Sequence, residues 1–305
     1  MIVKPNEMNF ENKKFAMIIA GVPGIGKTTL ALSSPKPLLI DLDKGVSRVV
    51  ARYRTDTSEV SSFDELKNDL TTSDLSAYET IVIDTGGKLL EMLKAVVIKE
   101  DSKNGKRDGN LSLQGYGAVK KKFREFIEFV KTLNKNLIIV FHASETQLEN
   151  DVVGLRIRIE GSSRDEVWDD IDIGGFVEMR GKNRTIGFSN CERYYAKGTH
   201  GIHGIYELPL LDGSCKNVFI TDLFNKMRSD LTEEVSEFKK YEKAMSLKTF
   251  IDKVNSIDDL NKCYDKVKEI EHSLTSKDEL WFALNNRAKE LGGKYDKEQN
   301  KFIIE

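Results

Sequence analysis

Short, continuous apolar runs alternate with segments of helical spacing over the first half of the chain. The apolar runs lie at residues 15–20, 38–40, 81–83 and 137–141, and helical spacing occupies 28–32, 63–70, 89–98 and 116–133. Runs of this length bounded by polar residues are typical of buried strands. Their alternation with helices predicts an α/β fold, with a mostly parallel sheet covered by helices on both faces. Ligands of such sheets bind at the carboxyl ends of the strands.

After residue 145 the pattern changes to strict alternation of polar and apolar positions. Arg156 and Arg158 alternate with aliphatic residues in 153–159, and residues 176–180 and 184–188 alternate in the same way. Period-two alternation is typical of a strand with one buried face. These segments therefore predict β-hairpins that extend the sheet beyond its parallel centre.

Beyond Phe224 the chain becomes charged and its apolar residues recur at helical spacing. Four helices are predicted, at 232–245, 247–254, 257–270 and 277–291. With apolar residues on one side and balanced charge on the other, they predict a small bundle, and we expect Trp281 and Phe282 in its core. The sequence thus predicts two domains, residues 1–228 and 229–305.

The first apolar run leads into a glycine-rich loop that matches the phosphate-binding pattern G-x-x-x-x-G-K-[ST] at every fixed position. The loop comprises Gly21, Val22, Pro23, Gly24, Ile25, Gly26, Lys27 and Thr28, and Thr29 follows it. Glycines allow the backbone N–H groups to approach a triphosphate closely. The lysine supplies a charge for the β- and γ-phosphates, and the threonine hydroxyl binds Mg²⁺. The pattern predicts ATP and Mg²⁺ as cofactors.

Polar residues also follow the other predicted strands. Asp84 ends a strand that we expect next to the phosphate-loop strand, and it is the candidate second Mg²⁺ ligand. Either Asp41 or Asp43 is a candidate to activate the attacking water, and Lys44-Gly45 would leave Asp43 exposed. His142 ends its strand where it can sense the γ-phosphate.

Composition narrows the setting of this chemistry. The 305 residues include 47 basic and 49 acidic side chains, a formal net charge of −2, so any nucleic-acid site must be a local patch. Three widely spaced cysteines, Cys191, Cys215 and Cys263, favour reduced thiols over a disulfide framework or a metal cluster. No apolar run approaches the length of a membrane span. We expect a soluble, cytoplasmic protein without a membrane partner.

A phosphate loop, a strand ending in Leu-Ile-Asp-Leu-Asp, a strand Ile-Val-Ile-Asp and a further polar-ended strand together resemble the RecA-type recombinase core. Over residues 12 to 225 the chain is similar to the compact phage-encoded RecA-like single-strand annealing ATPases. The resemblance implies a RecA-like P-loop NTPase core. It also implies that Asp43 activates water, that Asp84 holds the metal, and that His142 replaces the switch residue, commonly glutamine.

The resemblance further implies that two segments, about 99–117 and 143–163, contact single-stranded DNA. The first carries a local excess of positive charge, because residues 99–124 contain eight basic and three acidic side chains. The candidate DNA-binding residues are Lys103, Lys106, Arg107, Tyr116 and Lys120, with the tyrosine placed to stack on a base. A solvated loop with a packed tyrosine is the alternative interpretation.

In RecA-like assemblies a late basic residue acts on the nucleotide of the neighbouring subunit. The candidates here are Lys197 and Lys182, and the resemblance implies a homo-oligomer, as a filament or a ring. The leading hypothesis is an ATP-hydrolysing protein that binds single-stranded DNA in phage recombination or annealing, with a single-strand-binding protein as a further partner. The alternative is a nucleotide-gated protein-interaction module, a loader or regulatory switch, without direct DNA binding.

Overall fold

The computed structural model describes residues 2–147, 153–159, 167–210 and 212–305. The described chain divides into two compact units. Unit 2 comprises Lys13–Met227, and unit 1 comprises Met1–Asn12 together with Arg228–Glu305. The first twelve residues, which the sequence analysis assigned to the core, therefore group with the carboxy-terminal helices.

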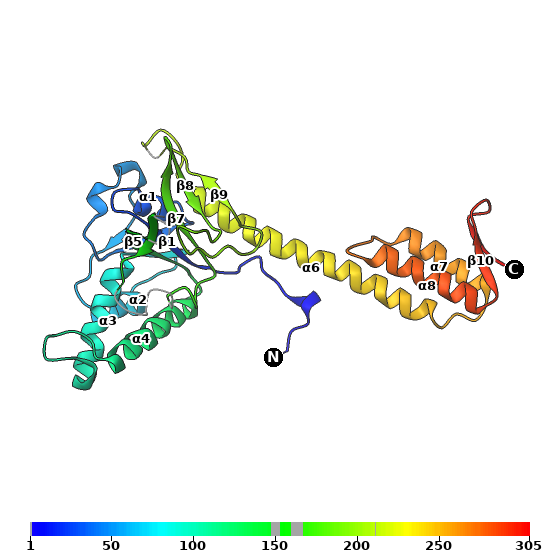
Figure 1. Cartoon of the computed structure of the whole chain (residues 1–305), viewed down its shortest axis with the longest axis horizontal. Coiled ribbons are helices and arrows are strands. Elements are labelled where there is room, and N and C mark those ends of the chain that lie inside the picture. Colours follow the sequence, from blue (N-terminus) through cyan, green and yellow to red (C-terminus); the bar gives the residue numbers. More distant parts are fainter. Residues whose placement is uncertain (1, 148–152, 160–166, 211) are drawn as a thin grey trace. The chain divides into compact units, whose positions relative to one another are not determined.

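Unit 2 is built on a nine-stranded sheet with the order β3-β2-β4-β5-β1-β7-β8-β9, and β6 pairs with β5 outside this path (Figure 1). The strands are β1 Ala16–Gly21, β2 Pro37–Asp41, β3 Thr57–Ser58, β4 Thr80–Asp84, β5 Asn136–Gln147, β6 Val153–Ile157, β7 Ile173–Arg180, β8 Asn183–Gly187 and β9 Ile205–Glu207. The pairs from β3 through β7 are parallel, whereas β8, β9 and β6 pair antiparallel. This confirms the predicted fold class.

Helices cover the sheet because its central strands are apolar on both faces. The helices of unit 2 are α1 Lys27–Ala31, α2 Phe63–Thr72, α3 Gly86–Glu100 and α4 Leu113–Thr132, with short 3-10 turns at Val46–Arg48, Ala51–Tyr53 and Ser102–Asn104. Ile18 of β1 and Ile83 of β4 belong to one apolar cluster with residues of α3 and α4. On the opposite face Met17 and Ile19 are equally buried. Ser cap residues open α2 and α4, at Ser62 and Ser112.

The strand order corrects one detail of the sequence analysis. Asp84 does not end a strand beside the phosphate-loop strand, because β5 lies between β1 and β4. Gly21 pairs instead with His142, the residue on β5. Residues 143–147 of the second predicted DNA segment continue strand β5 and pair with β6. Residues 148–152 and 160–163 of the predicted second DNA segment lie outside the described residues.

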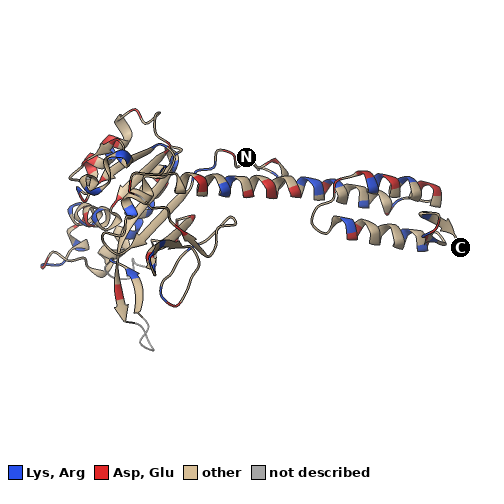
Figure 2. Cartoon of the chain, turned by 90° about the horizontal axis from the view of Figure 1, so that it is seen from above, with Lys and Arg blue, Asp and Glu red and all other residues tan. Residues whose placement is uncertain are grey.

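Unit 1 contains most of a long helix, two shorter helices and a hairpin. Helix α6 spans Phe219–Ile251 and contains the division between the two units at residues 227 and 228, close to the expected boundary. The expected break at 246 also falls inside this helix. It is followed by α7 Ile257–Glu269, α8 Ser276–Glu290, β10 Gly293–Asp296 and β11 Lys301–Ile304, and a 3-10 turn at Pro5–Glu7 precedes the core. Lys, Arg, Asp and Glu are interspersed along these helices (Figure 2). No described helix is long and apolar enough to cross a membrane.

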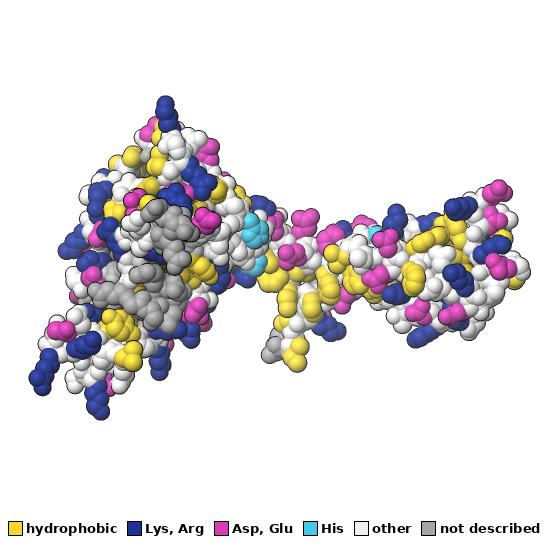
Figure 3. Space-filling model, in the orientation of Figure 1, with side chains coloured by type: hydrophobic (Ala, Val, Ile, Leu, Met, Phe, Trp, Pro, Cys, Tyr) yellow, Lys and Arg dark blue, Asp and Glu magenta, His cyan; other side chains and the backbone are white. Residues whose placement is uncertain are grey.

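The core of unit 1 does not contain the two residues expected there. Trp281 is 40% exposed and Phe282 is 65% exposed, whereas Leu280 and Leu284 are fully buried. Successive helical residues are about 100° apart, so a helix that buries 280 and 284 directs 282 away from the core. Phe282 is one of the apolar side chains that reach the surface of unit 1, where yellow patches are visible in Figure 3.

Candidate functional site: a phosphate loop with buried charges

The phosphate loop connects β1 to α1 in a conformation that requires its glycines. Gly24 and Gly26 have φ angles of 78° and 88°, in the left-handed region that favours glycine. A Cβ on Gly21 would lie 2.7 Å from the carbonyl oxygen of Val177, so the third glycine is required by packing. Lys27 opens α1 and its Nζ donates a hydrogen bond to the carbonyl oxygen of Val22 at 2.8 Å. The loop thus folds over its own lysine.

Lys27 and Asp84 are both buried at this edge of the sheet. Lys27 is 4% exposed and Asp84 is 6% exposed. Burial lowers the pKa of Lys27 to about 8, against the attraction of Asp84. Burial likewise raises the pKa of Asp84 to about 6, although a hydrogen bond from Thr28 opposes the shift. The two charged forms are therefore poorly solvated, a situation common at functional sites.

Thr28 and Asp84 meet directly, since the Thr28 Oγ1 donates to the Asp84 Oδ2 at 2.5 Å. A hydroxyl and a carboxylate oxygen are the hard ligands that Mg²⁺ prefers, usually alongside water and substrate phosphates. The pair therefore fits a magnesium ion, and Thr28 and Asp84 are the residues that would hold it. The ion would offset the phosphate charge that Lys27 alone cannot balance.

The two acids that follow β2 differ in what occupies their oxygens. Asp41 is 1% exposed, and its two oxygens accept the N–H groups of Gly45 at 3.0 Å and Val46 at 2.7 Å. Asp43 is partly exposed, and its Oδ2 accepts from Arg48 at 3.1 Å. The Asp84 carbonyl accepts the N–H of Asp43 at 3.1 Å, which fixes Asp43 beside the candidate magnesium ligand. Asp41 holds a turn, while Asp43 faces the site.

His142 lies next to the loop and next to Asp43. Its Nε2 is 4.0 Å from the Asp43 Oδ2, and its Nδ1 is buried without a partner among the described residues. Burial, followed by the charge of Lys27, lowers the pKa of His142 below its ordinary value of 6.5, although Asp43 opposes the shift. The imidazole is therefore neutral at pH 7, with one ring nitrogen still able to bond a ligand or water.

Two arginines that the sequence analysis did not assign to the phosphate loop reach this site. Arg184 of β8 lies against the loop, because a Cβ on Gly26 would be 2.3 Å from its Nη1. Arg158 follows β6, and its positive charge adds to the effect of burial in lowering the pKa of both Lys27 and His142. The backbone N–H of Arg158 donates to the His142 carbonyl oxygen at 2.8 Å. In the sequence these arginines are marked only as polar positions in segments where polar and apolar residues alternate, and that pattern does not indicate a contact with the phosphate loop.

Lys197 and Lys182, the candidates to act on the nucleotide of a neighbouring subunit, have different surroundings. The Nζ of Lys197 donates to the carbonyl oxygens of Trp168 at 3.1 Å and Asp169 at 3.5 Å, and its backbone forms a bridge with Gly174. The lysine therefore ties two segments of its own chain together. Lys182 lies exposed at the turn between β7 and β8.

A family model described as "AAA domain" matches residues 13–200, which is more than half of the chain. The chain belongs to this AAA domain family. The match covers the phosphate loop and all the groups described above, so the AAA domain is a P-loop NTPase. A solved structure of a KaiC-like protein from the hyperthermophilic archaeon Pyrococcus horikoshii is 10% identical with a TM-score of 0.37, over 64% of this chain and 89% of its own. No curated protein matches the chain.

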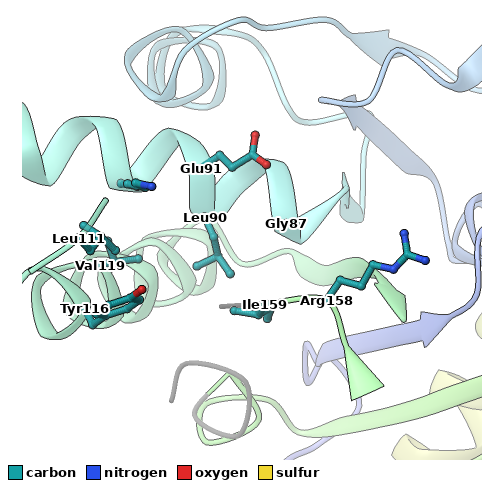
Figure 4. A pocket seen from close by; sticks show the side chains of 9 residues that line it. Gly87, Leu90, Glu91, Leu111, Tyr116, Val119, Arg158 and Ile159 are labelled. Carbon is teal, nitrogen blue, oxygen red and sulfur yellow. The ribbon is translucent and has the colours of Figure 1, made fainter. Parts of the chain in front are cut away.

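We call the edge of the sheet that carries the phosphate loop, Asp43, Asp84 and His142 the nucleotide edge. Outside this edge, the AAA domain brings parts of both predicted DNA segments to one cavity of about 570 Å³ (Figure 4). Tyr116 of α4 and Arg158 line it from the two segments, and Lys94 and Glu91 line it from α3. Gly87, Leu90, Leu111, Val119 and Ile159 complete the lining. Tyr116 is half-buried and can therefore present one ring face to the cavity.

The basic residues of the first segment separate into two groups. Lys103, Lys106 and Arg107 are exposed in the connection from α3 to α4 and pair with no acid among the described residues. Positive side chains project from this end of the AAA domain in Figure 3. By contrast, Lys122 pairs with Glu100 at 2.8 Å and Arg124 pairs with Asp170 at 2.8 Å. Lys120, on α4, is partly exposed.

Proposed function

We propose that the AAA domain binds and hydrolyses ATP with Mg²⁺. The observation that carries the proposal is the convergence of Lys27, Thr28, Asp84, Asp43 and His142 on one loop, although they come from four separate segments. Mg²⁺ held by Thr28 and Asp84 would neutralise charge on the phosphates. Lys27 contributes a further positive charge beside them.

Asp43 is the group that we propose to activate the attacking water. Its Oδ1 has no hydrogen-bond partner among the described residues, whereas both oxygens of Asp41 are occupied by backbone N–H groups. A general base needs a free lone pair within reach of the water, and this requirement selects Asp43. Neutral His142, 4.0 Å away, can orient the same water or bond the γ-phosphate.

We further propose that the AAA domain binds single-stranded DNA and acts in recombination or annealing, as the resemblance to phage-encoded RecA-like proteins implies. Two features support this. Unpaired Lys103, Lys106 and Arg107 offer sites for phosphates, and the cavity with Tyr116 offers a surface on which a base can stack. The cavity also adjoins the nucleotide site, because Arg158 lines it and bonds to the His142 backbone. A homo-oligomer and a single-strand-binding protein are the proposed partners.

A titration of a fluorescent oligonucleotide, with and without ATP and at several salt concentrations, tests this proposal. We expect binding that ATP strengthens and salt weakens, because phosphate contacts release counterions. Turnover of ATP, measured with Mg²⁺ and with excess chelator, tests the enzymatic part independently. Turnover without DNA binding at any salt concentration would favour the nucleotide-gated interaction module instead.

A further inference from the structure

Arg184 carries a positive charge that nothing in the described structure neutralises. Burial lowers the pKa of its guanidinium, and no described carboxylate pairs with it. The neighbouring arginine of the same hairpin, Arg180, instead pairs with Glu178 at 2.8 Å. Partly buried charges are costly to fold unless a partner compensates them, so the missing partner of Arg184 needs an explanation.

The hydrogen-bonding capacity of Arg184 is also largely unused. A guanidinium has five N–H donors. Nη2 donates to the carbonyl oxygen of Pro209 at 2.8 Å, Nη1 makes only a long contact of 3.5 Å with the carbonyl oxygen of Ile25, and the buried Nε has no partner. The hydrogen bond to Pro209 therefore does not account for the other N–H donors, which lie at the phosphate loop.

Strand order indicates which part of a nucleotide Arg184 would reach. Asp43 follows β2, Asp84 ends β4 and His142 lies on β5, and these three strands lie on one side of β1. Arg184 belongs to β8, on the other side of β1, and it meets the loop at Ile25 and Gly26. The groups proposed for hydrolysis act on the γ-phosphate, so Arg184 approaches from the side away from that phosphate.

We propose that Arg184 binds the α,β-diphosphate part of the nucleotide from within its own subunit. This inference rests on the proposed nucleotide binding and adds a residue and a specificity to it. The guanidinium would donate hydrogen bonds to two phosphate oxygens, a geometry that arginine forms readily with phosphate. Since ADP and ATP share the α,β-diphosphate, Arg184 would strengthen binding of both nucleotides equally.

Binding of ADP and of a non-hydrolysable ATP analogue to Arg184→Met and Arg184→Lys tests this inference. A lost charged hydrogen bond corresponds to about a 10- to 100-fold weaker Kd, and we expect the same factor for both nucleotides in Arg184→Met. Arg184→Lys should lose less, because it keeps the charge. Arg52→Met is the matched control, since Arg52 also donates to a backbone carbonyl, that of Gly213, and makes no hydrogen bond to the phosphate loop among the described residues.

Unchanged Kd values in Arg184→Met would overturn the inference, and so would weakening confined to the ATP analogue. Melting without nucleotide checks for a purely structural role. We expect the Tm of Arg184→Met to equal or exceed that of the wild type, because an uncompensated charge is removed. A lower Tm with wild-type affinities would show that Arg184 only supports Pro209. If the wild type itself binds no nucleotide, the proposed function fails, which is a separate result.

Discussion

The charges at the nucleotide edge of unit 2 and the charge cluster that links α6 to α8 in unit 1 are organised in opposite ways. Glu279 of α8 accepts hydrogen bonds from Thr275 at 2.7 Å, Tyr241 at 2.9 Å and Lys248 at 2.9 Å. These bonds, from Thr275 first, lower the pKa of Glu279 to about 2. Asp84 is instead shifted upward, to about 6, chiefly by burial. One carboxylate is stabilised as an anion and the other is destabilised.

This difference separates charges that support the fold from charges that we propose to bind a ligand. A group whose bonds are complete within the chain gains nothing from an added ion. Lys27, Asp84 and Arg184 are partly desolvated, and His142 and Arg184 keep buried nitrogens without described partners. Natural proteins depart from complete pairing mainly at functional sites. The contrast leads to predictions in which changes in unit 2 affect ligands and changes in unit 1 affect stability.

The largest effect is expected for Lys27→Ala, which should abolish ATP binding and turnover. In its proposed role Lys27 balances phosphate charge and fills none of the apolar core, so the Tm without nucleotide should stay near the wild-type value. Nucleotide titration and thermal melting measure the two properties separately. Lys67→Ala, an exposed lysine of α2, is the control. Retained turnover in Lys27→Ala would refute the assignment of the nucleotide site.

The second prediction separates the two acids after β2. Asp43→Asn should bind ATP and Mg²⁺ normally but turn over about 10²–10⁴-fold more slowly, because only the general base is lost. Asp41→Asn should mainly lower the Tm, because one oxygen that accepts a backbone N–H of the turn is replaced by an amide. Single-turnover kinetics and melting curves distinguish the two outcomes. A dead Asp41→Asn with an unaffected Asp43→Asn would reverse the assignment.

Tyr116→Ala tests whether the cavity receives a base. Loss of one stacking partner should weaken single-strand binding by roughly 1–3 kcal/mol, with little change in the salt dependence, because no phosphate contact is removed. Anisotropy titrations with a labelled oligonucleotide measure both quantities. Tyr116→Phe is the matched control, since it keeps the ring. Equal affinity of Tyr116→Ala and the wild type would leave the tyrosine with a packing role only.

Paired and unpaired lysines extend the comparison to DNA. Replacing Lys103, Lys106 and Arg107 together by alanine should weaken oligonucleotide binding. The slope of log affinity against log salt concentration should become shallower by up to about two units. The control triple variant removes the same charge from unit 1 at Lys240, Lys262 and Lys268, each of which pairs with an acid three residues earlier. Equal slopes for both triple variants would mean that net charge, and not this loop, governs binding.

The nucleotide edge could be predicted from sequence where a local motif encodes it. Lys27 and Thr28 are fixed by a contiguous pattern, and Asp84 by the end of an apolar strand. Strand order is not local, which is why β5 was not expected between β1 and β4. Arg184 was missed for the same reason, because its contact with Ile25 spans 159 residues.

The helical region shows signals that were present but not used. No proline or glycine interrupts residues 219–251, which is consistent with the single helix α6. Leu280 and Leu284 share one helical face, which excludes Phe282 from the same core. If the periodicity is followed across the whole segment and each residue is assigned to a helical face, the sequence predicts the continuous helix α6 and the exposure of Phe282.

The smallest effect is expected in unit 1, for Glu279→Gln. The pKa of Glu279 is about 2 in the folded chain and has an ordinary value of 4.5, so the folded state favours the anion. The stability it contributes is present above about pH 4.5 and is lost as the pH falls toward 2. Glu279→Gln should therefore melt at a lower temperature than the wild type at pH 7, and this difference should vanish near pH 2.

Fluorescence of Trp281 in a Trp168→Phe background follows unit 1, since the chain has two tryptophans. Nucleotide affinity should not change, and a Tm difference that is constant between pH 2 and 7 would show that the charge of Glu279 is not what stabilises the contact between α6 and α8.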